Sequence, residues 1–384
     1  MSTLSPIEEG IRAIAAGDLV VVADDEDREN EGDLIMAAEK TTPEKLAFMI
    51  RHTSGIICQP MVGERLDQLG LPQMVEQNTE SKRTAFTVSV DARRDTTTGV
   101  SAEDRARTVL ALADPDSRAE DFLKPGHIFP LRYREGGVLK RAGHTEAAVD
   151  LARLAGLRPA GILAELNNDD GTMMRMSELR RFAADHGLPL IAVADLIAYR
   201  YRNERIVERV RQSRVATEHG AWTYNLYRSP LYPGEHLALV RGEIDPCEPV
   251  LTRVHRSCLA GDVFQSKLCT CGAKLRASLR RITQEENGVF VYLRGPESHA
   301  FGGHETTEAR EQPDQDRVWR EHGLGAQILH DLGVKRMRLM SNTTASFAAL
   351  SGFGLEIVER VPLVTPVVDS EADDPSITSL IADA

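Results

Sequence analysis

Short apolar runs alternate with amphipathic stretches through the first half of the chain. The run at residues 19–23 (LVVVA) and the one starting at residue 34 (LIMAAE) are typical of buried strands. Residues 101–113 and 146–155 carry apolar side chains at helical spacing. This mixture predicts an α/β (α+β) domain with a mixed sheet that ends near residue 200. Further strands are expected at residues 55–58, 85–90, 161–164 and 189–193.

Capping residues mark two helix starts. Ser5, Pro6 and Glu8 predict a helix with Ser5 as its N-cap and Pro6 at its first position. That helix should end at Gly17. The sequence TPE at residues 42–44 predicts another helix behind the second strand.

The pattern changes after residue 200. Residues 201–217 are rich in arginine and glutamate and poor in large apolar side chains, which favours a linker over residues 201–216. The acidic, small-residue tail at 364–384 is expected to be loose. We therefore expect a first domain at residues 1–200 and a second α/β domain at residues 217–363. In the second domain, strands are expected at residues 237–240, 250–254, 289–292 and 337–340, and helices at 272–286 and 325–332.

Composition narrows the classes of partner. The chain has 384 residues and a net charge of -12, which argues against a general nucleic-acid or anionic-membrane binder. The polar N-terminus has no basic start and no apolar run behind it, and no stretch reaches the roughly 18 apolar residues of a membrane helix. A cytoplasmic location is the expectation.

An acidic loop follows the first expected strand. Residues 24–33 (DDEDRENEGD) hold seven carboxylates and the single cation Arg28. Like charges this close repel, and a divalent cation is the usual compensation. Hard oxygen ligands favour magnesium or manganese. A solvated acidic turn is the simpler reading, but the loop is wedged between two apolar strands, which favours a site.

Two histidines and a glutamate are further candidates. His127 lies between two prolines, His144 precedes a helical stretch together with Arg141 and Thr145, and Glu165 ends an apolar run. A helix start with a basic residue, a glycine and a threonine is a natural phosphate seat, and a carboxylate at a strand end suits a general base. Each of these residues could instead have only a structural role. His127 or His144 could be a buried histidine with satisfied hydrogen bonds, the Arg141–Thr145 segment could simply cap a helix, and Glu165 could be a surface residue in a salt bridge.

The first 200 residues resemble 3,4-dihydroxy-2-butanone 4-phosphate synthase across nearly the whole domain. The resemblance implies conversion of ribulose 5-phosphate into the four-carbon phosphate and formate without a redox cofactor, in a homodimer formed through this domain. The stretches that carry it are DDEDRENEGD, RHTSGIIC, TTTGVSAEDR, PGHIFPLR, GHTEAAVDLARLAG and AEL–NDDGTM.

The resemblance also implies a set of site residues. Glu29 and His144 would hold magnesium or manganese, with Glu31 near the metal, and His127 and Glu165 would be the acid–base residues. Enediol formation from a ketose phosphate needs such a base and a cation that stabilises the developing alkoxide. Ala142 stands where the family usually has glycine. The sugar phosphate would contact Arg28, Glu29, Asp33, Arg141, Ala142, Gly143, His144, Thr145 and Glu165.

The five cysteines include one cluster. Cys258, Cys269 and Cys271 have the spacing C-x10-C-x-C, and three thiolates with an open fourth position are typical of catalytic zinc. The alternative is that three cytosolic thiols lie close by chance. Cys247 has no obvious partner and is expected to be a buried thiol.

Residues 206–363 resemble GTP cyclohydrolase II. The resemblance rests on GEHLALVRGEI, RVHRSCLAGDVFQSKLCTCG, GLGAQILHDLGVKRMRL and GFGLEIVERVPL. It implies that Cys258, Cys269 and Cys271 hold zinc, and it aligns Arg320 with the family's catalytic arginine.

Several catalytic positions of that family are changed here. The loop that binds phosphates in the family reads PESH here, at residues 296–299. The segment that follows it, residues 301–316, is shorter than in the family. A loop near the end of the domain reads NTTAS, at residues 342–346, and lacks the family's lysine. Val318, Lys274 and Ser257 stand where an aspartate, a glutamine and a glutamate are usual. A triphosphate needs several charge-assisted contacts of roughly 1.5–3 kcal/mol each. The sequence thus favours a second domain without GTP turnover; a fully bifunctional enzyme, a nucleotide-binding or assembly module, and a changed substrate are the alternatives.

Overall fold

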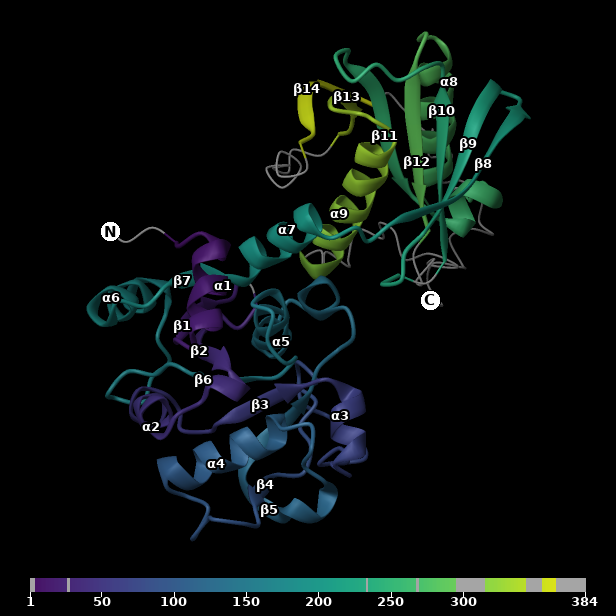
Figure 1. The fold of residues 1–384 in the computed structure, drawn as a ribbon. Coiled ribbons are helices and arrows are strands. Elements are labelled where there is room, and N and C mark those ends of the chain that lie inside the picture. The colour runs from purple at the N-terminus through teal and green to yellow at the C-terminus, as the bar shows by residue number, and fades with distance from the viewer. Residues whose placement is uncertain are drawn as a thin grey trace, which may run out of the picture. The chain divides into compact units, whose positions relative to one another are not determined.

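The computed structural model describes residues 4–25, 28–232, 234–266, 269–294, 315–342 and 354–363, and within 315–322 only the backbone. The chain divides into two compact units, residues 1–200 and residues 201–384. Each unit is built on a seven-stranded mixed sheet (Figure 1). The expectation of a two-domain α/β protein is therefore confirmed. Among the described residues, no helix is both long and apolar enough to cross a membrane.

The sheet of the first unit has the order β4-β5-β3-β6-β2-β1-β7. Strands β1, β2, β3 and β6 are buried along almost their whole length, because helices cover both faces of the sheet. β1 runs antiparallel to β2 and parallel to β7, and β3 runs parallel to β5. The strands are β1 (Val20–Ala23), β2 (Gly32–Ala37), β3 (Cys58–Met61), β4 (Val90–Ala92), β5 (Phe122–Arg132), β6 (Gly161–Glu165) and β7 (Leu190–Ala192).

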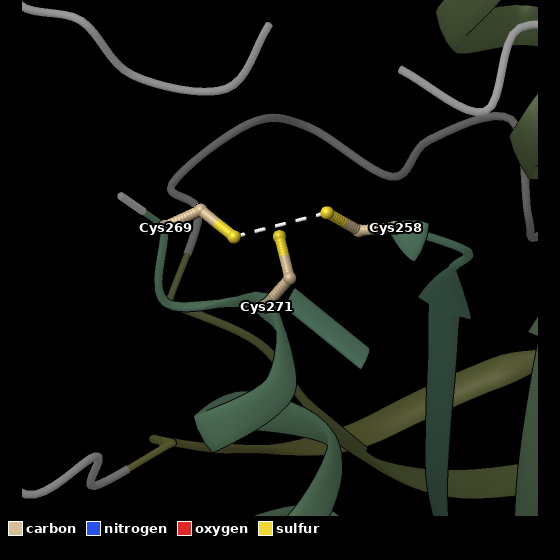
Figure 2. Close-up of side chains that lie close together, drawn as sticks. All are labelled: Cys258, Cys269 and Cys271. Atoms are coloured by element: carbon tan, nitrogen blue, oxygen red, sulfur yellow. Dashed lines mark hydrogen bonds between the residues drawn. The ribbon is translucent and has the colours of Figure 1, made fainter. Parts of the chain in front are cut away.

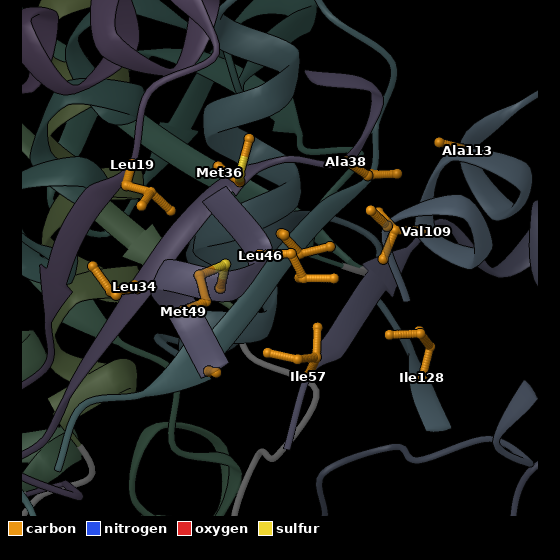
Figure 3. Packing of buried hydrophobic residues seen from close by; sticks show 14 of the residues in the cluster. Leu19, Leu34, Met36, Ala38, Leu46, Met49, Ile57, Val109, Ala113 and Ile128 are labelled. Carbon is orange, nitrogen blue, oxygen red and sulfur yellow. The ribbon is translucent and has the colours of Figure 1, made fainter. Parts of the chain in front are cut away.

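Helices α1 and α5 pack on one face of this sheet, and α2, α4 and α6 cover the other. Leu46 and Met49 of α2 and Val109 of α4 pack onto alternate residues of β1 and β2, such as Leu34 and Met36 (Figure 3). The helices are α1 (Ile7–Ala16), α2 (Pro43–His52), α3 (Gly63–Gln68), α4 (Ala102–Ala113), α5 (His144–Leu154), α6 (Met176–His186) and α7 (Val193–Asn203), with 3-10 turns η1 (Ala38–Lys40), η2 (Ala119–Asp121) and η3 (Gly137–Leu139).

Local signals placed most of these elements but not all their ends. The helix after Thr42 is present, and Thr42 accepts a hydrogen bond from the Lys45 N–H. The first helix ends at Gly17 in the left-handed conformation, as expected, but Ser5 does not cap it. The Ser5 N–H instead bonds to Leu190 O, so this residue belongs to the sheet edge. The strand expected at residues 55–58 begins at Cys58, and the one expected at 85–90 begins at Val90.

The second unit has the strand order β14-β13-β11-β12-β10-β9-β8. Strands β8, β9, β10 and β12 are antiparallel neighbours, whereas β11, β12, β13 and β14 include parallel pairs. The strands are β8 (Glu208–Thr217), β9 (Gly220–Arg228), β10 (Glu235–Arg241), β11 (Val250–Arg256), β12 (Gly288–Leu293), β13 (Arg336–Met340) and β14 (Glu356–Val361).

Helix α8 (Cys271–Thr283) and helix α9 (Gln315–Asp331) accompany this sheet, with the π-turn η4 (Leu259–Val263) after β11. Ile282 of α8 packs with Trp222 and Phe290 in a small apolar core. The linker expected at residues 201–216 is wrong: residues 208–217 form β8, paired along its length with β9. β8 is an edge strand exposed on both faces, so it lacks the apolar alternation that marks a half-buried strand. The tail at 364–384 lies outside the described residues.

Candidate functional site

Asp24 organises the acidic loop behind β1. Its Oδ1 accepts the Glu31 N–H at 2.9 Å, and its Oδ2 accepts the Glu29 N–H at 3.1 Å and the Arg28 guanidinium at 2.8 Å. The carboxylate is almost fully buried, which makes these three bonds strong. Asp24 was not singled out from the sequence, since one aspartate among seven carboxylates carries no local mark.

His144 is the first residue of α5 and is buried. Its Nε2 lies 3.1 Å from Val22 O, and because a carbonyl only accepts, Nε2 carries the proton. The unprotonated Nδ1 then faces Glu29 Oε2 at 3.8 Å and Asp33 Oδ1 at 3.7 Å. Burial lowers the pKa of His144, which favours the neutral imidazole that metals bind. Ligand atoms of Asp24, Glu29 and His144 lie within 4.8 Å of one another.

Asp33 and Glu165 complete this group from the sheet. The two residues are direct partners in the antiparallel pair β2–β6. Asp33 is buried, and its Oδ1 has no hydrogen-bond partner among the described residues. Burial, and next the charge of Glu165, raise the pKa of Asp33 well above its usual range. An orphaned buried carboxylate oxygen beside a histidine lone pair fits a hard divalent cation.

Glu165 is held by a residue that the sequence did not reveal. Ser54 Oγ donates to Glu165 Oε2 at 2.7 Å, and the Ser54 N–H donates to Glu165 O at 2.8 Å. Ser54 follows α2, more than a hundred residues from its partner along the chain. Glu31, expected near the metal, lies 3.8 Å from Arg175 Nη1, and its charge interacts with those of Glu29, Glu165 and Asp24.

His127 does not join this group by direct contact among the described interactions. It lies on β5, and its Nδ1 is 2.7 Å from Asp91 Oδ2. Its side chain is 43% exposed, so the ring is accessible and the reading as a buried structural histidine is excluded. The structure therefore brings Arg28, Glu29, Asp33, His144 and Glu165 together and leaves His127 on β5, which β3 separates from β6.

The loop before α5 is cationic and tightly packed. Arg141 Nη1 donates to buried Glu146 at 2.8 Å. A Cβ on Gly143 would lie 2.4 Å from Arg141 Nη1 and 3.0 Å from Arg28 Nη2, so a larger residue here would displace these guanidiniums. Ala142 is buried, and Thr145 follows at the helix start. Arg141, Thr145 and Glu146 line a cavity of about 960 Å³ whose wall has both charges: the cations Lys82, Arg83, Arg132 and Arg134, and the carboxylates of Glu64, Asp67 and Glu135.

The three clustered cysteines of the second unit converge, as Figure 2 shows. Cys258 Sγ and Cys269 Sγ are 3.7 Å apart, and all three sulfur atoms lie within 4.8 Å of one another. Gly261 and Gly272 pack backbone to backbone beneath them: a Cβ on Gly272 would lie 2.0 Å from Gly261 O. Burial, and next the neighbouring thiols, raise the pKa of Cys271. The thiolate form is therefore unfavourable without a metal, and a bound cation would stabilise it.

A polar network supports this cluster. Asp262 Oδ2 accepts the Cys258 N–H at 2.8 Å and the Tyr292 hydroxyl at 2.9 Å. His255 Nε2 lies 3.1 Å from both oxygens of Asp262. A cavity of about 160 Å³ next to the thiols is lined by Arg253, His255, Arg256, Cys269, Thr270, Cys271 and Lys274.

One further expectation for the second unit is wrong, and another is not tested by the described residues. Cys247, expected to be buried, is exposed, because it lies in a turn where its N–H bonds to Asp245. The changed positions at residues 296–299, 301–314 and 343–346 lie outside the described residues, and the side chains of Val318 and Arg320 also do.

Buried carboxylates held together against their repulsion, a neutral buried histidine and a cationic loop are the equipment of an active site. The first unit is therefore an enzyme domain of the α/β class. Residues 8–199 match the family described as 3,4-dihydroxy-2-butanone 4-phosphate synthase, and residues 208–362 match GTP cyclohydrolase II.

Relatives and solved structures agree with these matches. The riboflavin biosynthesis protein RibBA of Nocardia farcinica is 52% identical over 378 residues, which are 94% of this chain and 91% of that protein. The crystal structure of RibBX from A. baumannii, described as a two-domain 3,4-dihydroxy-2-butanone 4-phosphate synthase, has a TM-score of 0.77 and 42% identity over 93% of this chain and 99% of that chain. A synthase crystallised with two magnesium ions has a TM-score of 0.51 and 46% identity over 52% of this chain and 98% of that chain.

The chain belongs to the family of two-domain riboflavin biosynthesis proteins in which a 3,4-dihydroxy-2-butanone 4-phosphate synthase domain is joined to a GTP cyclohydrolase II domain. The synthase assignment made from the sequence is confirmed.

Proposed function

We propose that the first unit converts ribulose 5-phosphate into 3,4-dihydroxy-2-butanone 4-phosphate and formate, with magnesium or manganese held by Glu29 and His144. The observation that carries the proposal is the convergence of Asp24, Glu29 and His144 beside the paired carboxylates of Asp33 and Glu165. The two products together contain every atom of the substrate, so no redox cofactor is consumed.

The donor set supports a hard divalent cation. Carboxylate oxygens outnumber the single imidazole nitrogen, and the His144 lone pair points at the carboxylates because Nε2–H is tied to Val22 O. The magnesium ions in the related synthase crystal support the same choice. When bound, the cation supplies stabilisation of negative charge on the neighbouring substrate oxygens.

The protein's own groups supply orientation and proton transfer. Glu165 stands at a strand end with one carboxylate oxygen fixed by Ser54, which leaves the other oxygen free to accept a proton from the sugar. We assign His127 as its acid–base partner. Arg28, Asp33 and the loop Arg141–Thr145 bind the substrate; the start of α5, which borders the large cavity together with Arg141, suits its phosphate.

The test is a reaction of the purified full-length protein with Mg²⁺ and ribulose 5-phosphate, followed by NMR. We expect formate and the four-carbon phosphate in equal amounts, no product after chelation, and recovery with Mg²⁺ or Mn²⁺. Glu165→Gln should lower kcat by about 10³-fold or more, whereas Glu120→Gln, at an exposed position, should leave it unchanged. A folded, metal-loaded protein that makes neither product would refute the proposal.

For the second unit we propose a zinc site of Cys258, Cys269 and Cys271 without turnover of GTP. Lys274 lies in the small cavity beside the thiols, and Ser257 is nearly buried, so neither supplies the amide or carboxylate that the family usually has there. The match to GTP cyclohydrolase II and the converging thiols favour one alternative, a fully bifunctional enzyme. The cationic lining of the small cavity favours another, a nucleotide-binding or assembly module.

A parallel sample with GTP separates these three possibilities. Formate released from GTP would establish the bifunctional enzyme. A rise in Tm with GTP and no product would establish the binding module, and neither effect would support loss of both. We also propose that the chain forms a homodimer through the first unit and acts in the cytoplasm on a soluble sugar phosphate; sedimentation equilibrium tests the dimer.

A further inference from the structure

Both carboxylate oxygens of Asp91 contact His127. Oδ1 accepts the backbone N–H of His127 at 2.8 Å, and Oδ2 lies 2.7 Å from ring Nδ1. A carboxylate is acceptor-only when ionised, so this contact places the ring proton on Nδ1. The lone pair of the neutral ring is then on Nε2, at the exposed end of the side chain.

The surrounding backbone fixes the carboxylate. On one side, a Cβ on Gly126 would lie 2.0 Å from the carbonyl carbon of Val90, so β5 approaches β4 as closely as only glycine allows. On the other side, Gly99 has a φ of +82°, and a Cβ there would lie 2.1 Å from Asp91 Oδ2. Asp91 is itself buried, and Arg105 of α4 interacts with it electrostatically. The Asp91–His127 geometry is therefore enforced from two strands and a loop.

The register of the sheet places His127 toward the synthase site. Cys58 of β3 is the partner of both Phe129 on β5 and Leu163 on β6. His127 lies two residues before Phe129, and Glu165 lies two residues after Leu163. Both therefore lie beyond the same end of β3 and on the same face of the sheet. The neighbour of His127, Ile128, packs into the opposite face with α2 and α4. His127 therefore lies on the α5 face, as Glu165 does, and two strand spacings separate β5 from β6 by about 10 Å.

We propose that Asp91 is a positioning residue for the synthase reaction, which holds His127 with Nδ1 protonated and Nε2 directed at the substrate. The inference rests on the proposed acid–base role of His127. In the proposed step, Nε2 takes a proton from the sugar and returns it later, while the Nδ1 proton stays in place. The positive charge on the ring between the two transfers faces the Asp91 carboxylate.

Asp91→Asn tests this assignment because the amide can bond in one orientation only. Its oxygen must accept the backbone N–H of His127, which turns its NH2 group toward Nδ1. Nδ1 then accepts instead of donating, and the ring proton moves to Nε2, the atom that should act as base. We expect kcat to fall about 10²–10⁴-fold, in the range known for such carboxylate-to-amide changes, with KM for ribulose 5-phosphate changed less than about threefold.

A spectroscopic readout separates positioning from a structural role. The ¹⁵N resonances of the His127 ring, assigned by their absence in His127→Ala, should show protonated Nδ1 in the wild-type protein and protonated Nε2 in Asp91→Asn. The double variant Asp91→Asn/His127→Ala should be no slower than His127→Ala alone, because both changes remove the same function. Asp95→Asn, an exposed aspartate on the same segment, is the matched control and should keep wild-type activity and the Nδ1–H tautomer.

Each outcome decides the proposal. Loss of activity in His127→Ala with wild-type kcat and an unchanged tautomer in Asp91→Asn would overturn the role of Asp91 and leave the proposed function intact. Full activity of His127→Ala would overturn both the acid–base role of His127 and the role of Asp91. A double variant much slower than His127→Ala would show that Asp91 acts on something other than His127.

Discussion

Asp33 and Glu165 face each other across the antiparallel strands β2 and β6, two carboxylates in direct register at the ends of two central strands of a buried sheet. Such a pair is unfavourable for folding because like charges repel and burial removes their hydration. The pair is explained by the proposed synthase site, where both carboxylates are needed although they lower the stability of the fold.

We therefore expect opposite effects on stability and activity from Asp33→Asn. The amide removes one buried charge and offers N–H donors to neighbouring carboxylates, so the metal-free first unit should gain roughly 1 kcal/mol. Synthase activity should fall sharply, since the proposed contact between Asp33 and the substrate is lost. Calorimetry in the presence of a chelator measures the first effect. Asp18→Asn, at a side chain that is 61% exposed, is the control, and a destabilised Asp33→Asn would contradict the reading of Asp33 as a strained group.

Ser54→Ala should slow the synthase without weakening substrate binding. The hydroxyl makes a hydrogen bond to a charged group, worth about 1.5–3 kcal/mol when its partner must stay oriented. Loss of this bond should lower kcat by roughly 10–100-fold and leave KM nearly unchanged. Ser177→Ala, at an exposed position on α6, is the matched control. An equal effect of both variants on kcat would show that Ser54 does not orient Glu165.

The cysteine cluster should carry zinc that is independent of the synthase. Elemental analysis of the purified protein should give one zinc per chain, and Cys258→Ser should abolish it and lower the Tm of the second unit. Cys247→Ser should retain the metal, since that thiol is exposed and outside the cluster. Both variants should keep synthase kcat within about twofold. Zinc retained in full by Cys258→Ser would exclude the three-thiol site.

The second unit should lose stability in mild acid through His236. This residue of β10 is buried, its Nδ1 accepts the Arg294 N–H at 3.2 Å, and its Nε2 has no partner among the described residues. Burial, and next the charge of Arg294, lower the pKa of His236 to about 4. His236 of the unfolded chain binds a proton near pH 6.5, whereas in the folded protein it stays neutral down to about pH 4. The contribution of neutral His236 to the free energy of unfolding is therefore complete above pH 6.5 and is lost as the pH falls toward 4.

Between pH 7 and pH 5 the expected loss from His236 is about 2 kcal/mol. Both tryptophans of the chain, Trp222 and Trp319, belong to the second unit, so their fluorescence in urea reports its unfolding. His236→Asn keeps an acceptor for the Arg294 N–H and should flatten the pH dependence, whereas His330→Asn, at an exposed position, should not. A wild-type stability that is constant over this range would show that His236 is protonated in the folded state.

Local patterns in the sequence determined much of the secondary structure. The apolar run of β1 and the cap at Thr42 produced correct elements, because each depends on residues within one turn or one strand. β8 was missed for a physical reason: an edge strand exposed on both faces carries no apolar alternation, and only its pairing with β9 makes it a strand. The exposed position of Cys247 likewise follows from a turn and not from the residue type.

The sequence by itself determined which chemical groups this protein has: the acidic loop, His127, His144, Glu165 and the three thiols, each marked by a local motif. Only the tertiary structure decided how they are held. Asp24 accepts hydrogen bonds from the backbone of its own loop, whereas Ser54 binds the side chain of Glu165 and Asp91 binds the side chain of His127, and no spacing along the chain reveals these contacts. Pairing across strands joins residues far apart in the sequence, and that pairing sets the orientation, charge and proton positions on which catalysis depends.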